Sequence, residues 1–209
     1  MILRDSPEWA LARVGYVTAS RFDAVMAKIK TGEAAERRNY RTEIITERLT
    51  GVPIDRYHNA AMQWGTDNQP AAVAAYEAET GVIVQPEAFI PHPSIPWVGA
   101  TPDGLVGDDG LVEIKCPHVT FHHLSAWLDK AMPAEHRPQV QGQLFVTGRK
   151  WADFISFDPR LPERLRLLVV RVARDDAYIA ELEKAVRSFL EEIEQWMSRI
   201  AAEQEKQEA

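Results

Sequence analysis

The order of helical and strand-like segments limits the folds that this 209-residue chain can adopt. Up to about residue 81, helical patterns dominate, with segments at 34–50 and 70–80 that each end at a glycine. Helices are also expected at 120–130, at 135–147 and from Asp175 onward. Short runs rich in Val, Ile, Phe and Trp predict strands at 82–90, 95–100, 111–116, 152–157 and 166–173. This order predicts an α/β (α+β) fold with a central mixed β-sheet flanked by helices.

The chain has no internal repeat and no low-complexity linker, so we expect a single domain over residues 1–209. Its parts are N-terminal helices at 6–50, a core at 60–173 and a C-terminal helix at 175–207. No apolar run reaches the roughly 18 residues of a membrane span, and the first residues lack the apolar segment of a signal peptide. Cys116 is the only cysteine, which excludes an internal disulfide. These features predict a cytoplasmic protein without a membrane partner.

The net charge of −7 is unevenly distributed. Residues 175–209 hold ten acidic and four basic side chains, which leaves a charge of only −1 for the rest of the chain. Residues 21–48 are mildly basic and either face phosphate or form an ordinary solvated helix surface. The overall acidity therefore does not exclude a nucleic-acid substrate.

The stretch GATPDGLVGDDGLVEIKCP, residues 99–117, combines acidic side chains, a lysine and turn-forming glycines. Because side chains alternate along a strand, Glu113 and Lys115 share one face, with Val112 on the other. The intervening glycines can turn the chain back and bring Asp103 beside Glu113. Two carboxylates and a backbone carbonyl suit Mg²⁺, and a nearby lysine can orient or deprotonate a water molecule. The alternative from pattern alone is a surface hairpin with an ion pair of little energetic weight.

Four separated stretches, in the same order, resemble the lambda exonuclease and YqaJ-like recombinase family of the PD-(D/E)XK nucleases. They are WALARVGYVTASRF (9–22), WGTDNQPAAVAAYEAETG (64–81), ATPDGLV…GLVEIKCP (100–117) and RPQVQGQLFVTGRKWADFISFDPR (137–160). The resemblance implies a restriction-endonuclease-like core and an alkaline exonuclease that depends on Mg²⁺, with Mn²⁺ as a substitute. Such an enzyme degrades one strand of double-stranded DNA from its 5′ end, releases mononucleotides and leaves 3′ overhangs for recombination by strand annealing.

The resemblance also implies roles for the residues around the hairpin. Asp103 and Glu113 are similar to the family's metal ligands, assisted by the carbonyl of Ile114. Lys115 matches the water-positioning or general-base residue, and Gln139 matches a glutamine beside the active site. Together these residues form the expected catalytic centre.

Further matches concern a doubtful second metal position and the 5′-phosphate pocket. Gln69 stands where the family commonly has a glutamate, so a second Mg²⁺ is expected to bind weakly there. Arg13, Thr18, Ser20 and Thr101 match the family's phosphate-binding stretch and its neighbourhood. A helix is expected to begin near Ser20, whose hydroxyl and backbone amides then add donors for a phosphate.

The family resemblance implies two kinds of protein partner. One is further copies of the chain in a ring-shaped homotrimer around DNA, and the other is a single-strand annealing protein. Two alternatives to the exonuclease remain open, namely an endonuclease of restriction or repair type and a catalytically weak protein that binds DNA ends.

Two further patterns invite an interpretation. Cys116, His118, His122 and His123 lack zinc-ligand spacing and are expected to be surface or DNA-facing residues. From residue 179 the tail has an apolar stripe with alternating steps of three and four residues. The stripe predicts packing across the sheet or against a neighbouring subunit, with a coiled coil as the alternative.

Overall fold

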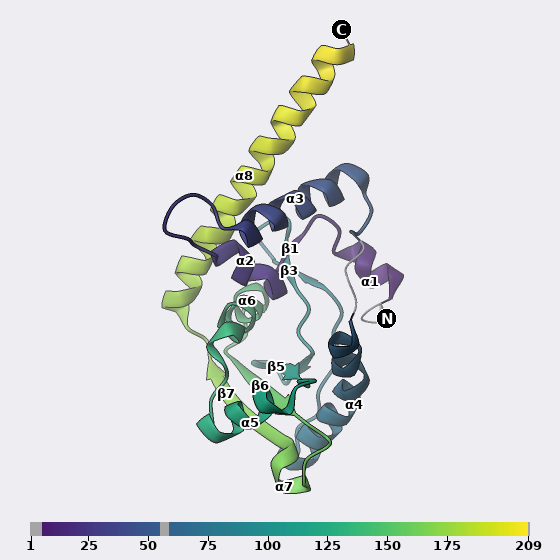
Figure 1. The fold of residues 1–209 in the computed structure, drawn as a ribbon, viewed down its shortest axis with the longest axis vertical. Helices are drawn as coiled ribbons and strands as arrows, with labels where there is room; N and C mark the ends of the chain where they lie inside the picture. Colours follow the sequence, from purple (N-terminus) through teal and green to yellow (C-terminus); the bar gives the residue numbers. More distant parts are fainter. Residues whose placement is uncertain (1–5, 55–58, 209) are drawn as a thin grey trace.

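The computed structural model describes residues 6–54 and 59–208 of the chain (Figure 1). Its helices are α1 (Pro7–Ala12), η1 (Ala19–Arg21), α2 (Phe22–Met26), α3 (Ala35–Thr50), α4 (Ala60–Thr80), α5 (Thr120–Asp129), η2 (Ala134–His136), α6 (Arg137–Thr147), α7 (Glu163–Arg166) and α8 (Asp176–Glu208). Its strands are β1 (Val17–Thr18), β2 (Ile90–Pro91), β3 (Val98–Ala100), β4 (Gly104–Val106), β5 (Gly110–Lys115), β6 (Trp151–Phe157) and β7 (Leu167–Ala173). The α/β class predicted from the sequence is confirmed.

The strands form two mixed sheets, the central one that we expected and a smaller one that we did not. The larger sheet has the order β4-β5-β6-β7, with β5 and β6 parallel and the other neighbours antiparallel. The smaller sheet has the order β1-β3-β2, with β1 parallel to β3. The strand expected at 82–90 is reduced to a single bridge between Gln85 and Leu105 ahead of β2. Pro86 follows that bridge and has no amide hydrogen to continue the pairing.

Helices cover both faces of the larger sheet. Val112 and Ile114 of β5 pack in one apolar cluster with Ala72 and Tyr76 of α4, whereas Leu111 belongs to the cluster formed with α6 and α8. The Tyr76 hydroxyl donates a hydrogen bond of 2.7 Å to the buried carboxylate of Asp153 on β6, which fixes α4 on its face of the sheet. The alternation expected for β5 is therefore confirmed, since neighbouring residues enter different cores.

The helix α8 packs mainly on the helices α2, α3 and α6 and shares an apolar cluster with Leu111 of β5, where the tail pattern had suggested packing across the sheet or against a neighbouring subunit. Five residues of the predicted stripe are buried, namely Ile179, Leu182, Val186, Phe189 and Ile193. The stripe leaves the core at Trp196, which is 46% exposed, and the helix continues beyond the body of the molecule (Figure 1). No helix in residues 6–54 or 59–208 is long and apolar enough to cross a membrane.

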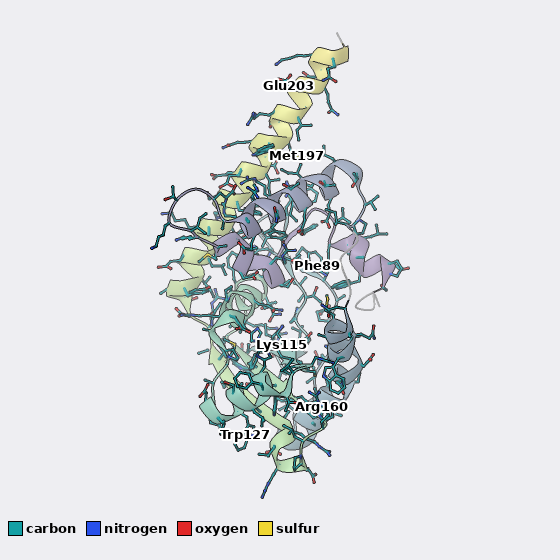
Figure 2. The ribbon with its side chains drawn as sticks, in the orientation of Figure 1. Phe89, Lys115, Trp127, Arg160, Met197 and Glu203 are labelled. Atoms are coloured by element: carbon teal, nitrogen blue, oxygen red, sulfur yellow. The ribbon has the colours of Figure 1, made fainter. Side chains whose placement is uncertain are left out.

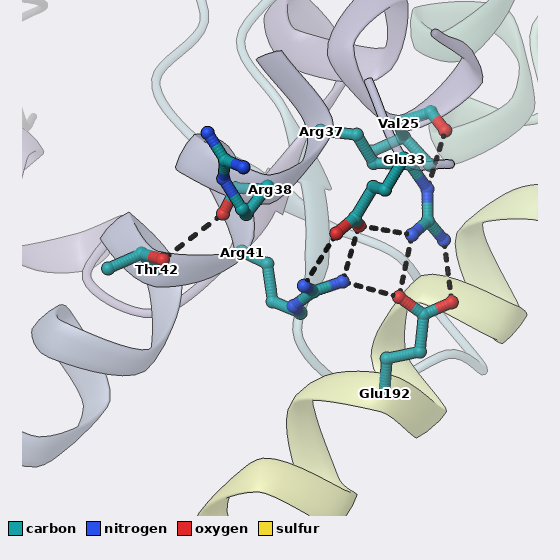
Figure 3. Close-up of polar contacts among 7 residues, drawn as sticks. All are labelled: Val25, Glu33, Arg37, Arg38, Arg41, Thr42 and Glu192. Atoms are coloured by element: carbon teal, nitrogen blue, oxygen red, sulfur yellow. Dashed lines mark hydrogen bonds and ion pairs between the residues drawn. The ribbon is translucent and has the colours of Figure 1, made fainter. Parts of the chain in front are cut away.

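A cluster of four charged side chains ties α3 to α8 (Figure 3). Arg37 donates two hydrogen bonds, of 2.6 and 2.7 Å, to the carboxylate of Glu192, and Arg41 contacts both Glu192 and Glu33. Arginines of the basic segment 21–48 thus have acidic partners within the chain, and Arg48 likewise pairs with Glu194. Much of the positive charge of this segment stabilises the fold.

Candidate active site

The hairpin of β4 and β5 brings Asp103 to the edge of β5. Gly104 pairs with Val112, and the amide of Asp103 donates to the carbonyl of Val112 at 3.1 Å. A Cβ atom at Gly104 would lie 2.2 Å from Val84, so only glycine fits this close approach. The Asp103 carboxylate reaches past the end of β4, where its Oδ2 accepts a hydrogen bond of 2.6 Å from the amide of Ile114. The side chain thereby takes the place of a continued β4 backbone.

Glu113 and Lys115 lie on one face of β5, as the alternating pattern predicts. The Lys115 Nζ lies 2.6 Å from Oε1 of Glu113 and donates a second hydrogen bond of 3.0 Å to Oε1 of Gln139. The Glu113 side chain is only 2% exposed, whereas Lys115 is 29% exposed. Lys115 lies in the middle part of the molecule, with α4 and α6 on either side (Figure 2). The buried carboxylate and the more accessible ammonium group form the centre of the site.

The helix α6 supplies two glutamines to this centre. Gln139 contacts Lys115, and one turn later Gln143 donates a hydrogen bond of 2.6 Å to Oε2 of Glu113. Gln141 lies on another side of the helix, where its side chain bonds to the backbone of Ala173 and Asp175. Gln143 was not identified from the sequence, although a spacing of four residues from Gln139 puts both on one helix face.

The helix α4 contributes Gln69, whose Nε2 donates to Oδ1 of Asp103 at 3.1 Å. This helix begins at Ala60 and not at residue 70 as predicted, because Asn59 caps it through a hydrogen bond from the amide of Met62. Pro70 lies inside the helix and does not end it. Gln69 is therefore held on a regular helix that spans the edge of the site.

The predicted site residues line one cleft of about 570 Å³, with one exception. The cleft is lined by Arg13, Ser20, Gln69, Thr101, Asp103, Glu113, Ile114, Lys115 and Gln139. Thr18 does not line it: its side chain is 3% exposed and its amide is bonded to the hydroxyl of Tyr40. Trp9, Glu135 and His136 also line the cleft and were not identified from the sequence, whereas His122, which lines it too, was expected to face the surface or DNA. Burial and the charge of Lys115 lower the pKa of His136, which favours a neutral imidazole there.

The residues predicted to bind a phosphate are arranged differently from what the sequence suggested. Helical structure does begin near Ser20, because η1 starts at Ala19 and α2 follows at Phe22, but neither helix has a side-chain cap, so the expected capping role of Ser20 was wrong. The Ser20 hydroxyl instead lies 3.3 Å from that of Thr18. The guanidinium of Arg13 stacks on Trp9, 3.9 Å from the ring centroid. The Thr101 hydroxyl oxygen is buried and has no hydrogen-bond partner in the described part of the chain.

The oxygen atoms of the hairpin fit a hard divalent cation. Asp103 and Glu113 each bond one oxygen to side chains that line the cleft. The carbonyl of Ile114 leaves the same edge of β5 as its amide, which is the edge that Asp103 occupies. Carboxylate and carbonyl oxygens with water molecules are the ligands that Mg²⁺ prefers. Asp103, Glu113 and Ile114 are therefore the residues that would hold such an ion.

A zinc site finds no support in the geometry. In residues 6–54 and 59–208, no three His, Cys, Asp or Glu side chains are grouped to hold a metal. Burial raises the pKa of Cys116 to about 12, so the group stays a thiol. His123 is fully buried, with its ring nitrogens 2.8 Å from the Ser156 hydroxyl and 2.7 Å from the carbonyl of Leu165. The expectation that it lies on the surface was wrong.

Comparisons with known proteins agree with this architecture. The model of the YqaJ-like viral recombinase domain matches residues 8–150. The crystal structure of an alkaline exonuclease (LHK-Exo) from Laribacter hongkongensis is 47% identical in sequence. The match covers 95% of this chain and 99% of that one, with a TM-score of 0.86, and the same values hold for its complex with dAMP.

A more distant structure has the same fold. It is a phage related exonuclease from Haemophilus somnus, 16% identical, with a TM-score of 0.71 and coverage of 88% of this chain and 96% of that one. A search of curated proteins found no match. The matched domain and the 47% identity over nearly the whole chain show that this protein belongs to the YqaJ-like viral recombinase family.

Proposed function

We propose that the protein is a Mg²⁺-dependent exonuclease that degrades one strand of double-stranded DNA in the 5′ to 3′ direction. The observation that carries this proposal is a single cleft with two carboxylates and a lysine in its centre and with Arg13, Ser20 and Thr101 in the same lining. The first group suits the hydrolysis of a phosphodiester, and the second suits recognition of a terminal phosphate. The 47% identical relative is an alkaline exonuclease, which supports the same activity here.

In the proposed reaction Asp103, Glu113 and the Ile114 carbonyl would hold Mg²⁺, for which Mn²⁺ could substitute. When bound, the ion would lower the pKa of a water molecule and neutralise charge on the phosphate. Lys115 orients the attacking water or accepts its proton, and as an ammonium group it stabilises the developing negative charge. Gln139, which accepts a hydrogen bond from Lys115, keeps the ammonium group directed into the cleft.

The water oxygen attacks phosphorus while the bond from phosphorus to the 3′ oxygen of the terminal nucleotide breaks. The 3′ oxygen leaves with a proton, so the product is a mononucleotide and the new DNA end carries a 5′ phosphate. That phosphate is the group that Arg13 can bind through two parallel hydrogen bonds, with Ser20 and Thr101 as hydroxyl donors. The relative's crystal structure in complex with dAMP, a deoxynucleoside monophosphate, supports a product of this class.

The proposal includes a ring-shaped homotrimer that encloses DNA and a single-strand annealing protein that receives the exposed 3′ strand. A ring can collect basic groups on its inner side, which accounts for a DNA substrate despite the net charge of −7. Light scattering in moderate salt should give about three times the chain mass of 23.6 kDa. A monomer at micromolar concentration contradicts the ring. The cytoplasmic location stays a prediction.

The test of the activity compares linear and covalently closed circular duplex DNA, with Mg²⁺ and with a chelator. We expect Mg²⁺-dependent release of mononucleotides from linear DNA alone, beginning at the 5′ end of an end-labelled strand. The Asp103→Asn variant should be inactive, whereas Asp109→Asn, a change at an exposed position in the turn of the same hairpin, should retain activity. Cleavage of the circle would identify an endonuclease, and binding without release would identify an end-binding protein.

A further inference from the structure

The two carboxylates of the cleft share one arrangement of hydrogen bonds. In each, one oxygen is bonded to a donor of the protein framework: Oδ2 of Asp103 to the amide of Ile114, and Oε2 of Glu113 to Nε2 of Gln143, both at 2.6 Å. The first donor belongs to β5, and the second to a side chain of α6 that is 1% exposed. Neither donor can swing out into solvent.

The second oxygen of each carboxylate is bonded to a side chain that lines the cleft. Oδ1 of Asp103 accepts from Gln69, and Oε1 of Glu113 is paired with Lys115. Both partners are partly accessible side chains that can turn aside without disturbing the backbone. A cation that enters the cleft therefore meets one available oxygen from each carboxylate.

We propose that Gln143 is a positioning residue that makes the site select Mg²⁺ over Ca²⁺. This inference rests on the proposed Mg²⁺-dependent function. By occupying Oε2, Gln143 limits Glu113 to coordination through Oε1 alone. Mg²⁺ takes about six ligands at about 2.0–2.1 Å with few carboxylate oxygens, whereas Ca²⁺ takes about six to eight, often with both oxygens of one carboxylate. A carboxylate held to a single oxygen favours the smaller ion.

The surroundings of Gln143 fix both its amide orientation and its position. Its Oε1 is buried without a hydrogen-bond partner among the described residues, and turning the amide around would place this oxygen against Oε2 of Glu113. Two acceptors would then face each other, so the amide group must donate to Glu113. The preceding residue, Gly142, packs so closely on Phe22 that a Cβ atom would lie 2.4 Å from the ring. The helix cannot move Gln143 away from Glu113 without breaking this contact.

The test measures binding of Mg²⁺ and of Ca²⁺ to the full chain without DNA, by calorimetric titration and by the rise in Tm that each ion produces. Gln143→Met keeps the side-chain volume and removes the donor. We expect Mg²⁺ binding to weaken by about 10- to 100-fold, the usual effect of losing a group that orients a metal ligand. Ca²⁺ binding should be retained or strengthened, because Oε2 becomes available. The ratio of the Kd for Ca²⁺ to the Kd for Mg²⁺ should therefore fall by about tenfold or more.

The matched control is Gln141→Met, which removes an equally buried amide from the same helix without touching Glu113. It should leave the Kd ratio at the wild-type value. If Gln143→Met does not fold, Gln143→Asn serves instead, because the shorter side chain withdraws the donor and keeps the amide. An unchanged ratio, or equal weakening of both ions, overturns the role of Gln143. If the wild type binds Mg²⁺ in neither measurement, the Mg²⁺-dependent function fails together with this inference.

Discussion

The substitution Gln69→Glu tests whether residue 69 borders the cation site. In the structure Nε2 of Gln69 donates to Oδ1 of Asp103 across 3.1 Å. The substitution replaces that donor with a second carboxylate oxygen and so brings two negative charges together beside the middle of α4. Without a cation, the two groups must repel, move apart or take up a proton.

The distance sets the size of the expected effect. Two unit charges about 3 Å apart repel by about 5 kcal/mol at an effective dielectric constant of about 20, and by about 3 kcal/mol after moving to about 5 Å. A bound divalent cation relieves this repulsion, and because about 1.4 kcal/mol corresponds to a factor of ten, Mg²⁺ should bind up to about 100-fold more tightly. Without Mg²⁺ the variant should be less stable than the wild type, with a Tm lower by about 6–12 °C for a chain of this size.

The assay is a Mg²⁺ titration followed by calorimetry and by thermal unfolding, with nuclease rate as a third readout. The variant should reach half its maximal rate at a lower Mg²⁺ concentration, and saturating Mg²⁺ should restore its Tm. The control is Gln63→Glu on the same helix, where Gln63 donates to Asp67 at 2.7 Å on an exposed surface and solvent screens the new charge. An unchanged or raised Mg²⁺ requirement in Gln69→Glu would refute the reasoning.

Three further predictions concern Lys115 in the centre of the cleft, Arg13 as a phosphate-binding residue, and the cluster of charged side chains between α3 and α8. Lys115→Met should lower the rate by about 10²–10⁴-fold while Mg²⁺ still binds, and a near-normal rate on linear duplex would exclude its catalytic role. Arg13→Ala should slow digestion of 5′-phosphorylated ends by about 2 kcal/mol or more and affect 5′-hydroxyl ends less; equal slowing of both would assign Arg13 to general backbone contact. Burial alone would raise the pKa of Glu192, but hydrogen bonds from Arg37 and Arg41 outweigh burial and lower the pKa. The stabilisation that the Glu192 carboxylate gives to the fold is therefore present above about pH 4.5 and is lost as the pH falls. Glu192→Gln should therefore lower the free energy of unfolding by about 1–2 kcal/mol near neutral pH and by less at about pH 3. An equal loss from Glu191→Gln, at an exposed position, would contradict a stabilising role of the charged cluster.

Local patterns in the sequence were sufficient to predict those features of the structure that depend on backbone geometry alone. The alternation of β5 correctly placed Glu113 and Lys115 on one face, and the glycine-rich turn correctly predicted the hairpin that returns Asp103 to them. The ends of α3 and α4 also followed from Gly51 and Gly81, each in the left-handed conformation at the helix end. These features need no knowledge of distant parts of the chain.

Features that depend on contacts between residues far apart in the sequence were either not predicted or predicted wrongly. The contact of Gln143 with Glu113 joins residues 30 positions apart, and only the position of α6 on the sheet selects it over Gln141. The capping pattern at Ser20 failed because the segment enters the smaller sheet through β1 and continues as η1 before α2 begins. The second, smaller sheet was not predicted, because strand propensity does not specify which strands become neighbours.

The rate at which Cys116 is alkylated can measure local opening of the structure next to the candidate active site. Cys116 directly follows Lys115, the last residue of β5 and part of the candidate active site, and only the ionised form of a thiol attacks alkylating reagents. With a pKa raised to about 12 by burial, the native thiol is almost entirely protonated as well as covered. Alkylation therefore proceeds through openings that expose the end of β5, and its rate reports how often this part of the sheet separates. Since the chain has no second cysteine, the signal comes from one known position beside the active site.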